Sequence, residues 1–199
     1  MDTDKVEAIL ELAEKKGILR PKDVQEAGLP RQYVYRLLED ERLEKVGRGL
    51  YKLPDKVFTI NERVIEAVRK VNHGVLCLIS ALEFHDMTTQ IPKKVWMAIE
   101  VKARAPKIRF PIEIIRMSGS AFKEGIEEHN VDNINVRVYS PAKTVADCFK
   151  FRSKIGLDVC LEALRDFHRQ NMGTMDDIWK YAKINRVQKI IRPYMEAQQ

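Results

Sequence analysis

The stretch LPRQYVYRLLEDERLEKVGRGLYKL at residues 29–53 predicts a short helix followed by a two-stranded ribbon. Pro30 suits the first helical turn, because the N–H that proline lacks would be unpaired there. At about 100° per residue, a helix from Pro30 separates its side chains into two faces. The apolar face holds Tyr33, Val34, Leu37 and Leu38, and the polar face holds Arg31, Gln32, Tyr35 and Arg36. We therefore expect the first face to pack and the second to be exposed.

The ribbon is predicted from the runs Leu43 to Val46 and Leu50 to Leu53, which Gly47-Arg48-Gly49 joins. Glycines on both sides of Arg48 allow positive φ values and place the arginine at the tip. An exposed basic helix beside such a ribbon suits DNA, with the helix in the major groove. The expected DNA-binding residues are Arg31, Gln32, Tyr35, Arg36, Arg48 and Lys52. The alternative is an ordinary amphipathic helix and hairpin inside a larger core.

The segment that precedes this stretch favours the DNA-binding interpretation. A first helix, capped by Asp2, Thr3 or Asp4, carries apolar residues at helical spacing until Gly17 ends it. After a short extended link, Arg20-Pro21 begins a second helix, which Gly28 closes. Helix, link, helix, turn, helix and hairpin form the order of a winged helix-turn-helix. We therefore predict this DNA-binding domain at residues 1–55.

Residues 56–199 predict a mixed α+β domain with a small sheet and several helices, so that the whole chain is α+β. Its expected strands are Val95 to Ile99, Ile112 to Met117 and Asn133 to Tyr139. Its expected helices include Val64 to Val71, Leu76 to Phe84, and helices that begin after Ser140, Gly156 and Thr174. The final segment, Arg186 to Ala197, is helical in pattern but is expected to be broken at Pro193.

Composition and charge limit the possible functions. The chain has 199 residues, is 45% hydrophobic and 32% charged, and carries a net charge of +6, so it is globular. Residues 1–55 hold 11 basic and 12 acidic side chains, and the excess of +7 lies in the remainder. DNA binding therefore has to rest on a local face rather than on net charge. The sequence shows no signal peptide or transmembrane run, so we expect a soluble, cytoplasmic protein with no membrane contact.

Motifs in both halves of the chain are similar to those of one known family. In the first half they are Gly17, Asp23, Gly28, Leu37, strand 43–46 and GRGLYKLP at 47–54. In the second half they are CLISALEFH at 77–85, VRVYSPAKTVADCFKFR at 136–152 and GLDVCLEALRDF at 156–167. On these motifs the chain resembles the AbiEi antitoxins of bacterial type IV toxin-antitoxin systems from Asp4 to Phe167. The SPAKTVADC segment is the most specific of them.

The resemblance implies a function with two parts. The N-terminal domain would repress its own promoter by binding double-stranded DNA with inverted repeats. The domain at 56–199 would counteract a cognate nucleotidyltransferase toxin, directly or indirectly, in a system of phage resistance. A protein of this kind is not an enzyme and needs no cofactor. We expect the two activities to separate at Pro54-Asp55.

Two short patterns offer catalytic alternatives. Asp86, followed by Glu100 and Lys102, resembles a metal-dependent nuclease pattern, in which carboxylates bind Mg²⁺ and lysine assists. Ser140 and Lys143 share a helix face with Thr144 and Asp147, which would also suit a Ser-Lys nucleophile. We favour a structural interpretation of the second pattern, with Ser140 as N-cap and Lys143–Asp147 as an i,i+4 pair. The histidines lack metal-ligand spacing, so no metal site is expected, and the three cysteines are expected to be buried, reduced thiols.

A basic stretch at residues 91–120 has a local charge of +5. Its charged residues are Lys93, Lys94, Lys102, Arg104, Lys107, Arg109 and Arg116, with Glu100 and Glu113. Three interpretations remain open for it: a solvated face, an extended contact with the DNA backbone, or a surface that meets a toxin.

Overall fold

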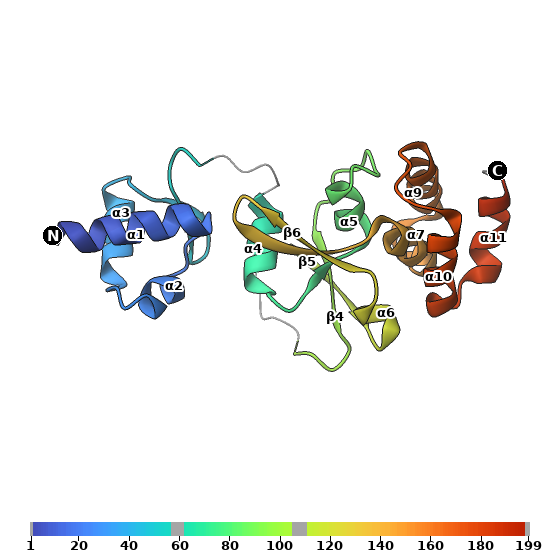
Figure 1. The fold of residues 1–199 in the computed structure, drawn as a ribbon, viewed down its shortest axis with the longest axis horizontal. Coiled ribbons are helices and arrows are strands. Elements are labelled where there is room, and N and C mark those ends of the chain that lie inside the picture. Colours follow the sequence, from blue (N-terminus) through green and yellow to red (C-terminus); the bar gives the residue numbers. More distant parts are fainter. Residues whose placement is uncertain (1, 57–61, 105–110, 198–199) are drawn as a thin grey trace. The chain divides into compact units, whose positions relative to one another are not determined.

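The computed structural model describes residues 2–56, 62–104 and 111–197 of a mixed α+β chain (Figure 1). The chain divides into two compact units. We call Met1–Glu66 with His129–Asn135 the N-terminal unit, and Ala67–Glu128 with Val136–Gln199 the C-terminal unit. The functional boundary predicted between residues 55 and 56 remains a prediction.

Three short helices open the N-terminal unit in the predicted order: α1 (Thr3–Lys16), α2 (Pro21–Glu26) and α3 (Gln32–Glu39). Gly17 ends α1 with a φ of 66°, as expected from its freedom to adopt positive φ. The predicted start of the third helix at Pro30 is wrong by two residues. The N–H of Tyr33 donates to the carbonyl of Pro30, so Pro30 lies in a tight turn just before α3.

An antiparallel hairpin, β1 (Glu44–Gly47) with β2 (Leu50–Lys52), follows α3. Leu19 and Tyr51 exchange backbone hydrogen bonds of 2.8 and 3.0 Å, so the short link after α1 adds a third extended segment to the hairpin. The expectation that two glycines share the turn needs correction. Gly47 pairs with Leu50 at the end of β1, after a bulge. Gly49, in the turn itself, has the positive φ of 72°.

One apolar cluster holds these helices and the hairpin together. Its buried members come from all three helices and from the hairpin: Val6, Ile9, Ala13, Leu19, Val24, Tyr33, Val34, Leu37, Leu43 and Tyr51. Burying one such large side chain contributes about 1.5–3 kcal/mol. The apolar face of α3 is therefore fixed by packing, which determines where its opposite face points.

A five-stranded sheet has the order β5-β4-β3-β7-β6. Its strands are β3 (Val75–Leu76), β4 (Val95–Glu100), β5 (Ile112–Met117), β6 (Ile126–Val131) and β7 (Ile134–Tyr139). Strand β3 is antiparallel to β4 and parallel to β7, and β4 is parallel to β5. The predicted strands β4, β5 and β7 are confirmed, while β3 and β6 were not predicted. The helix expected from Leu76 begins only at Leu78, because Leu76 belongs to the central strand.

Helices make up most of the remaining described residues. They are α4 (Glu62–Lys70), α5 (Leu78–Phe84), α6 (Ser120–Lys123), α7 (Pro141–Lys150), α8 (Arg152–Ile155), α9 (Leu157–Arg169), α10 (Met175–Asn185) and α11 (Gln188–Glu196). The predicted caps Ser140 and Thr174 are confirmed at α7 and α10. The break predicted at Pro193 is wrong, because α11 continues through it, with Ile191 and Met195 buried in the core.

Helix α7 is the centre of the C-terminal unit. In Figure 1, α9, α10 and α11 gather around it near the C-terminus of the chain. Every residue from Ala142 to Phe149 is buried, so α7 has no solvent-facing side along most of its length. The cysteines of this unit, Cys77, Cys148 and Cys160, are free and buried, as predicted. A helix enclosed on all sides must also bury its polar residues, which include Lys143 and Asp147.

Candidate nucleic-acid interface and a buried charge network

The exposed face of α3 carries the side chains predicted to contact DNA. Arg31, Gln32, Tyr35 and Arg36 are all exposed, and Tyr35 is 50% exposed although it is aromatic. Tyr33, Val34 and Leu37 on the other face are buried, so the predicted separation of faces is confirmed. The Arg36 guanidinium lies 6.0 Å from the centre of the Tyr33 ring. A polar, basic helix face therefore stands free on a packed scaffold.

Arg48 and Lys52, the two hairpin residues predicted to bind DNA, differ in their exposure and in their contacts within the protein. Arg48 occupies the turn between β1 and β2 and is exposed, as the sequence predicts. The Lys52 side chain is only 15% exposed, lies 3.4 Å from the Glu44 carboxylate and donates a 3.0 Å hydrogen bond to the Lys56 carbonyl. The structure thus leaves Arg48 available to a ligand and engages Lys52 within the protein.

Asp23 ties the end of α1 to the start of α2. Its carboxylate accepts hydrogen bonds from the backbone and guanidinium of Arg20, at 2.7–2.9 Å, and from Lys16 at 3.1 Å. Burial by itself would raise the pKa of Asp23, but the hydrogen bonds from Arg20 and Lys16 outweigh it and hold the pKa well below its usual range. A charged carboxylate therefore fixes the first two helices against each other.

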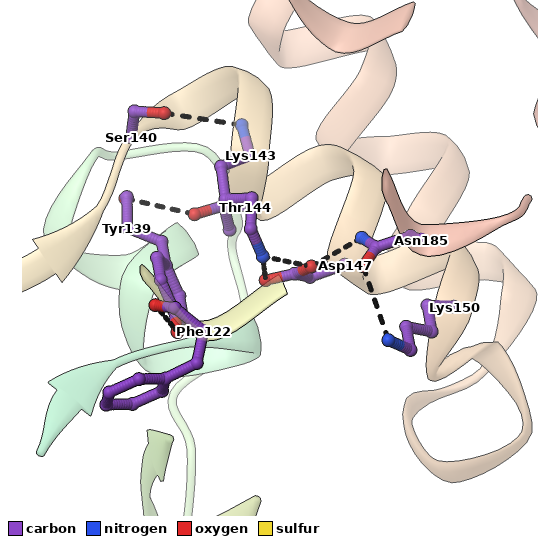
Figure 2. Close-up of polar contacts among 8 residues, drawn as sticks. All are labelled: Phe122, Tyr139, Ser140, Lys143, Thr144, Asp147, Lys150 and Asn185. Atoms are coloured by element: carbon purple, nitrogen blue, oxygen red, sulfur yellow. Dashed lines mark hydrogen bonds and ion pairs between the residues drawn. The ribbon is translucent and has the colours of Figure 1, made fainter. Parts of the chain in front are cut away.

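A second polar centre lies inside the C-terminal unit (Figure 2). The Lys143 ammonium is 2.5 Å from the Asp147 carboxylate, and both side chains are fully buried. The Asn185 amide of α10 donates a 2.6 Å hydrogen bond to the same carboxylate, and its carbonyl accepts one of 3.3 Å from Lys150. We call Lys143, Asp147, Lys150 and Asn185 the buried charge network. It joins both ends of α7 to the end of α10.

Burial dominates the electrostatics of this network. Loss of water raises the pKa of Asp147 above its ordinary value, and Lys143 and Asn185 oppose this shift without cancelling it. The Lys143 ammonium also lies 4.2 Å from the centre of the Tyr139 ring, whose hydroxyl donates to the Phe122 carbonyl at 2.8 Å. A buried ion pair needs further hydrogen bonds to offset its loss of water, and Asn185 supplies one to Asp147.

The structural interpretation of the SPAK segment is confirmed. Ser140 caps α7 by accepting a hydrogen bond from the Lys143 N–H, and the Thr144 hydroxyl donates to the Tyr139 carbonyl. The Lys143 ammonium is bound to Asp147, and the Ser140 hydroxyl accepts from the Lys143 N–H, so the geometry does not support a Ser-Lys nucleophile. The sequence predicted the i,i+4 pair but not its complete burial. Asn185 was missed, because nothing in local spacing connects it to α7.

The nuclease alternative gains no support from the geometry. Glu100 accepts a 2.7 Å hydrogen bond from the backbone N–H of Lys102, which turns its carboxylate toward its own strand end. Asp86 is exposed after α5 and has a positive φ of 54°. Within residues 2–56, 62–104 and 111–197, no group of three or more His, Cys, Asp or Glu residues could hold a metal ion.

Part of the basic stretch 91–120 is neutralised or used internally. Lys94 pairs with Glu113 at 3.3 Å, and Arg116 donates to the carbonyls of Val101 and Ala103. Lys93, Lys102 and Arg104 are exposed, whereas Lys107 and Arg109 lie outside the described residues. Lys94 and Arg116 are therefore less available to a partner than the sequence indicates, although the net charge of the stretch is unchanged.

Three short helices with a hairpin, and an exposed polar face on the third helix, are the arrangement typical of helix-turn-helix regulators. Residues 7–54 match the family described as "Transcriptional regulator, AbiEi antitoxin". Residues 7–54 are therefore similar to the AbiEi antitoxin family of transcriptional regulators, which confirms the resemblance found in the sequence for this part of the chain. The match contains α2, α3 and the whole hairpin. No curated protein matches the chain.

None of the helices within the described residues is long and apolar enough to cross a membrane.

Proposed function

We propose that residues 1–55 form a winged helix-turn-helix repressor domain that binds the promoter of its own operon. The observation that carries this proposal is the exposed face of α3, where Arg31, Gln32, Tyr35 and Arg36 stand on a helix whose other face is buried. The family match over residues 7–54 supports it, because that family consists of transcriptional regulators. In this proposal α3 lies in the major groove and the β1–β2 hairpin is the wing.

Each side chain has a role that follows from its chemistry. Arg31 and Gln32 stand at the N-terminal end of α3, where recognition helices reach base edges, and they suit guanine and adenine respectively. Tyr35 and Arg36 lie one turn further and contact adjoining phosphates. Arg48 at the hairpin turn meets phosphate or the minor groove. Lys52 contributes least, because Glu44 and the Lys56 carbonyl already engage it.

Gel shifts with the DNA upstream of the gene, and with a scrambled duplex, test this proposal. Arg31→Ala should weaken binding to the promoter by about 1–3 kcal/mol and leave the scrambled duplex less affected, because a base contact is lost. Arg48→Ala should weaken both duplexes alike and lower the slope of log affinity against log salt by about 1. Lys5→Ala on α1, paired with Asp2, is the control and should change neither. Unchanged promoter binding in the Arg31→Ala/Arg48→Ala double variant would contradict the proposal.

We further propose that the domain at 56–199 counteracts a cognate nucleotidyltransferase toxin. The support is the resemblance of the SPAKTVADC segment to the antitoxins, together with its position: it forms the buried helix α7 around which that unit packs. The nuclease alternative has no comparable support. A protein with these two parts would act in the cytoplasm without a cofactor.

Growth during toxin induction, measured beside a promoter reporter, separates the two activities within the full chain. Arg31→Ala/Arg48→Ala should lose repression of the reporter and still protect the cells. A fragment of residues 56–199 should also protect without repressing, and residues 1–55 should bind DNA weakly without protection. Loss of protection in the double variant at unchanged protein level would show that protection comes from repression instead.

A further inference from the structure

An open pocket of about 570 Å³ lies in the C-terminal unit where α7 and α10 end beside the start of α6. Two cations line it, Lys150 at the end of α7 and Arg186 just after α10, together with the hydroxyls of Ser118 and Ser120. The lining contains no acidic side chain. The DNA-binding proposal uses none of these residues, so their arrangement calls for a separate explanation.

The buried charge network positions one of these cations. The Lys150 ammonium donates to the Asn185 carbonyl, and Asn185, which is only 6% exposed, is held in turn by Asp147 (Figure 2). The Lys143 ammonium binds the Asp147 carboxylate directly, whereas the Lys150 ammonium contacts only the neutral carbonyl of Asn185 in this network. The network has a net charge of +1 when all three groups are ionised, and its lysine nearest the pocket carries the excess.

The electrostatic setting of Lys150 is consistent with an uncompensated charge. Burial lowers the pKa of Lys150, Asp147 acts in the opposite direction, and the neighbouring cations Lys143 and Arg186 lower it further. The carbonyl ends of α7 and α10 favour cations here and account for part of the positioning. They do not account for Ser118 and Ser120, which also line the pocket. An anion in the pocket would meet both cations and both hydroxyls.

We propose that this pocket binds the phosphate group of a small phosphorylated ligand, either a nucleotide or free phosphate. Arg186 supplies a planar fork of donors, Lys150 supplies a point charge, and Ser118 and Ser120 supply hydroxyl donors. Donors from several directions suit the three terminal oxygens of a phosphate better than the two of a carboxylate. Ala121 and Ile184 add an apolar wall against which a ribose or base can pack.

The shape of the site favours a small ligand over duplex DNA. The pocket lies between the end of β5, α6 and the ends of α7 and α10, and Lys150 and Arg186 are among its lining residues. A duplex presents phosphates on a convex surface and is best met by an exposed helix or hairpin, such as α3 and Arg48 in the N-terminal unit. The proposal therefore assigns a ligand to the C-terminal unit that is distinct from the operator.

Isothermal titration calorimetry on the full chain tests the proposal, with ATP, inorganic phosphate and a promoter duplex as probes at constant ionic strength. We expect saturable binding of ATP or of phosphate, and whichever binds identifies the source of the phosphate group. Arg186→Asn should weaken that binding about 10-fold or more. Asparagine is chosen because it tolerates the positive φ of 58° at this exposed position. Lys150→Gln should have a similar effect.

Lys183→Gln is the matched control, because Lys183 is exposed on α10 but does not line the pocket. It should change the affinity less than twofold, and unchanged fluorescence of Trp179 on α10 should show that each variant is folded. Failure of both ATP and phosphate to bind would overturn the proposal. Equal losses in Arg186→Asn and Lys183→Gln, or an effect of Arg186→Asn on duplex binding alone, would overturn it as well.

Discussion

Each unit of the molecule contains one buried aspartate that binds cationic side chains, and the two behave in opposite ways. Asp23 in the N-terminal unit has a pKa well below its usual range, whereas Asp147 in the C-terminal unit has a raised pKa. Both carboxylates are fully covered. Two things differ: Asp147 lies deep in the interior, where loss of water dominates its pKa, and its partner Lys143 is completely buried. The partners of Asp23, Lys16 and Arg20, are 36% and 30% exposed.

We infer that the access of water to both partners affects what an ion pair contributes. Lys16 and Arg20 keep part of their hydration while they donate to Asp23, so that pair favours the charged carboxylate and stabilises the fold. Lys143 and Asp147 both lose their water, so their attraction has to offset a large desolvation cost. We infer that the N-terminal pair contributes net stability and that the C-terminal pair fixes how α7 packs against α10.

The largest effect is expected from breaking the C-terminal pair. Asp147→Ala leaves the Lys143 ammonium and the Asn185 amide buried without their acceptor, which should lower the free energy of unfolding by about 3–5 kcal/mol. Urea unfolding followed by tryptophan fluorescence measures this effect. Both tryptophans, Trp96 and Trp179, lie in the C-terminal unit, so the signal reports that unit alone.

The double variant Lys143→Met/Asp147→Leu is the control for this prediction. With both charges removed, no buried charge of the pair is left without a partner, so stability should return to within about 1–2 kcal/mol of the wild type. If the pair served specificity, the double variant should also show broadened side-chain resonances in NMR spectra. A double variant as unstable as Asp147→Ala would show that the ion pair is itself a net source of stability.

A smaller effect is expected in the N-terminal unit. Asp23→Asn removes a charged acceptor of hydrogen bonds from Arg20 and Lys16 and should destabilise the packing of α1 on α2 by about 1.5–3 kcal/mol. Hydrogen exchange of peptides from residues 3–56 should become faster, while the tryptophan transition stays unchanged. A shift of the tryptophan transition by a similar amount would show that the two units unfold together.

The two aspartates should also respond to pH with opposite signs. The pKa of Asp23 in the folded state lies below its ordinary value, so its stabilisation is present above about pH 4 and is lost as the pH falls. Because the pKa of Asp147 is raised, this group favours folding below about pH 3.8 and opposes folding as the pH rises above that value. Between pH 5 and about 3, the stability of residues 3–56, measured by protection from hydrogen exchange, should therefore fall less steeply in Asp23→Asn than in the wild type. If the stability of the variant fell as steeply at low pH, titration of other groups would have to cause the fall.

The smallest effect should come from an ion pair with ample water on both sides. Lys22 and Glu26 on α2 are 3.3 Å apart, and their side chains are 75% and 57% exposed. Glu26→Gln should change stability by no more than about 0.5 kcal/mol at low salt and less at high salt. Exchange rates of α2 amides, compared with those of Asp23→Asn, provide the measurement. A loss as large as that of Asp23→Asn would contradict the role given to burial.

Features that depend on neighbouring residues were predictable from the sequence. The faces of α3 follow from helical periodicity alone, and the caps Ser140 and Thr174 follow from side chains that bond within their own first turn. Strand β3 was missed because two residues carry no periodicity, and their pairing depends on Met97 and Val138. The predicted break at Pro193 was wrong because the packing of Ile191 and Met195 outweighs the loss of the one hydrogen bond that proline removes.

The candidate sites show the same division. Arg31, Gln32, Tyr35, Arg36 and Arg48 were placed on the surface from local pattern. The engagement of Lys52 depends on Glu44 across the hairpin and was not foreseen. The Lys143–Asp147 pair was predicted from its spacing, but its burial depends on α10, and Asn185 reaches Asp147 across 38 residues. Chemistry that one helix contains could be predicted, and chemistry that two helices share could not.

The two-residue strand β3 has a consequence for the order in which the chain folds. Strand β3 is the central strand of the sheet, and its Leu76 pairs with Val138 of β7. The sheet therefore cannot be completed until Val138 has been synthesised. During synthesis, the three helices and the hairpin have already left the ribosome by then, and their most distant backbone pairing joins Leu19 to Tyr51. The nascent chain would thus present a finished α3 and Arg48 while its second half is still being translated.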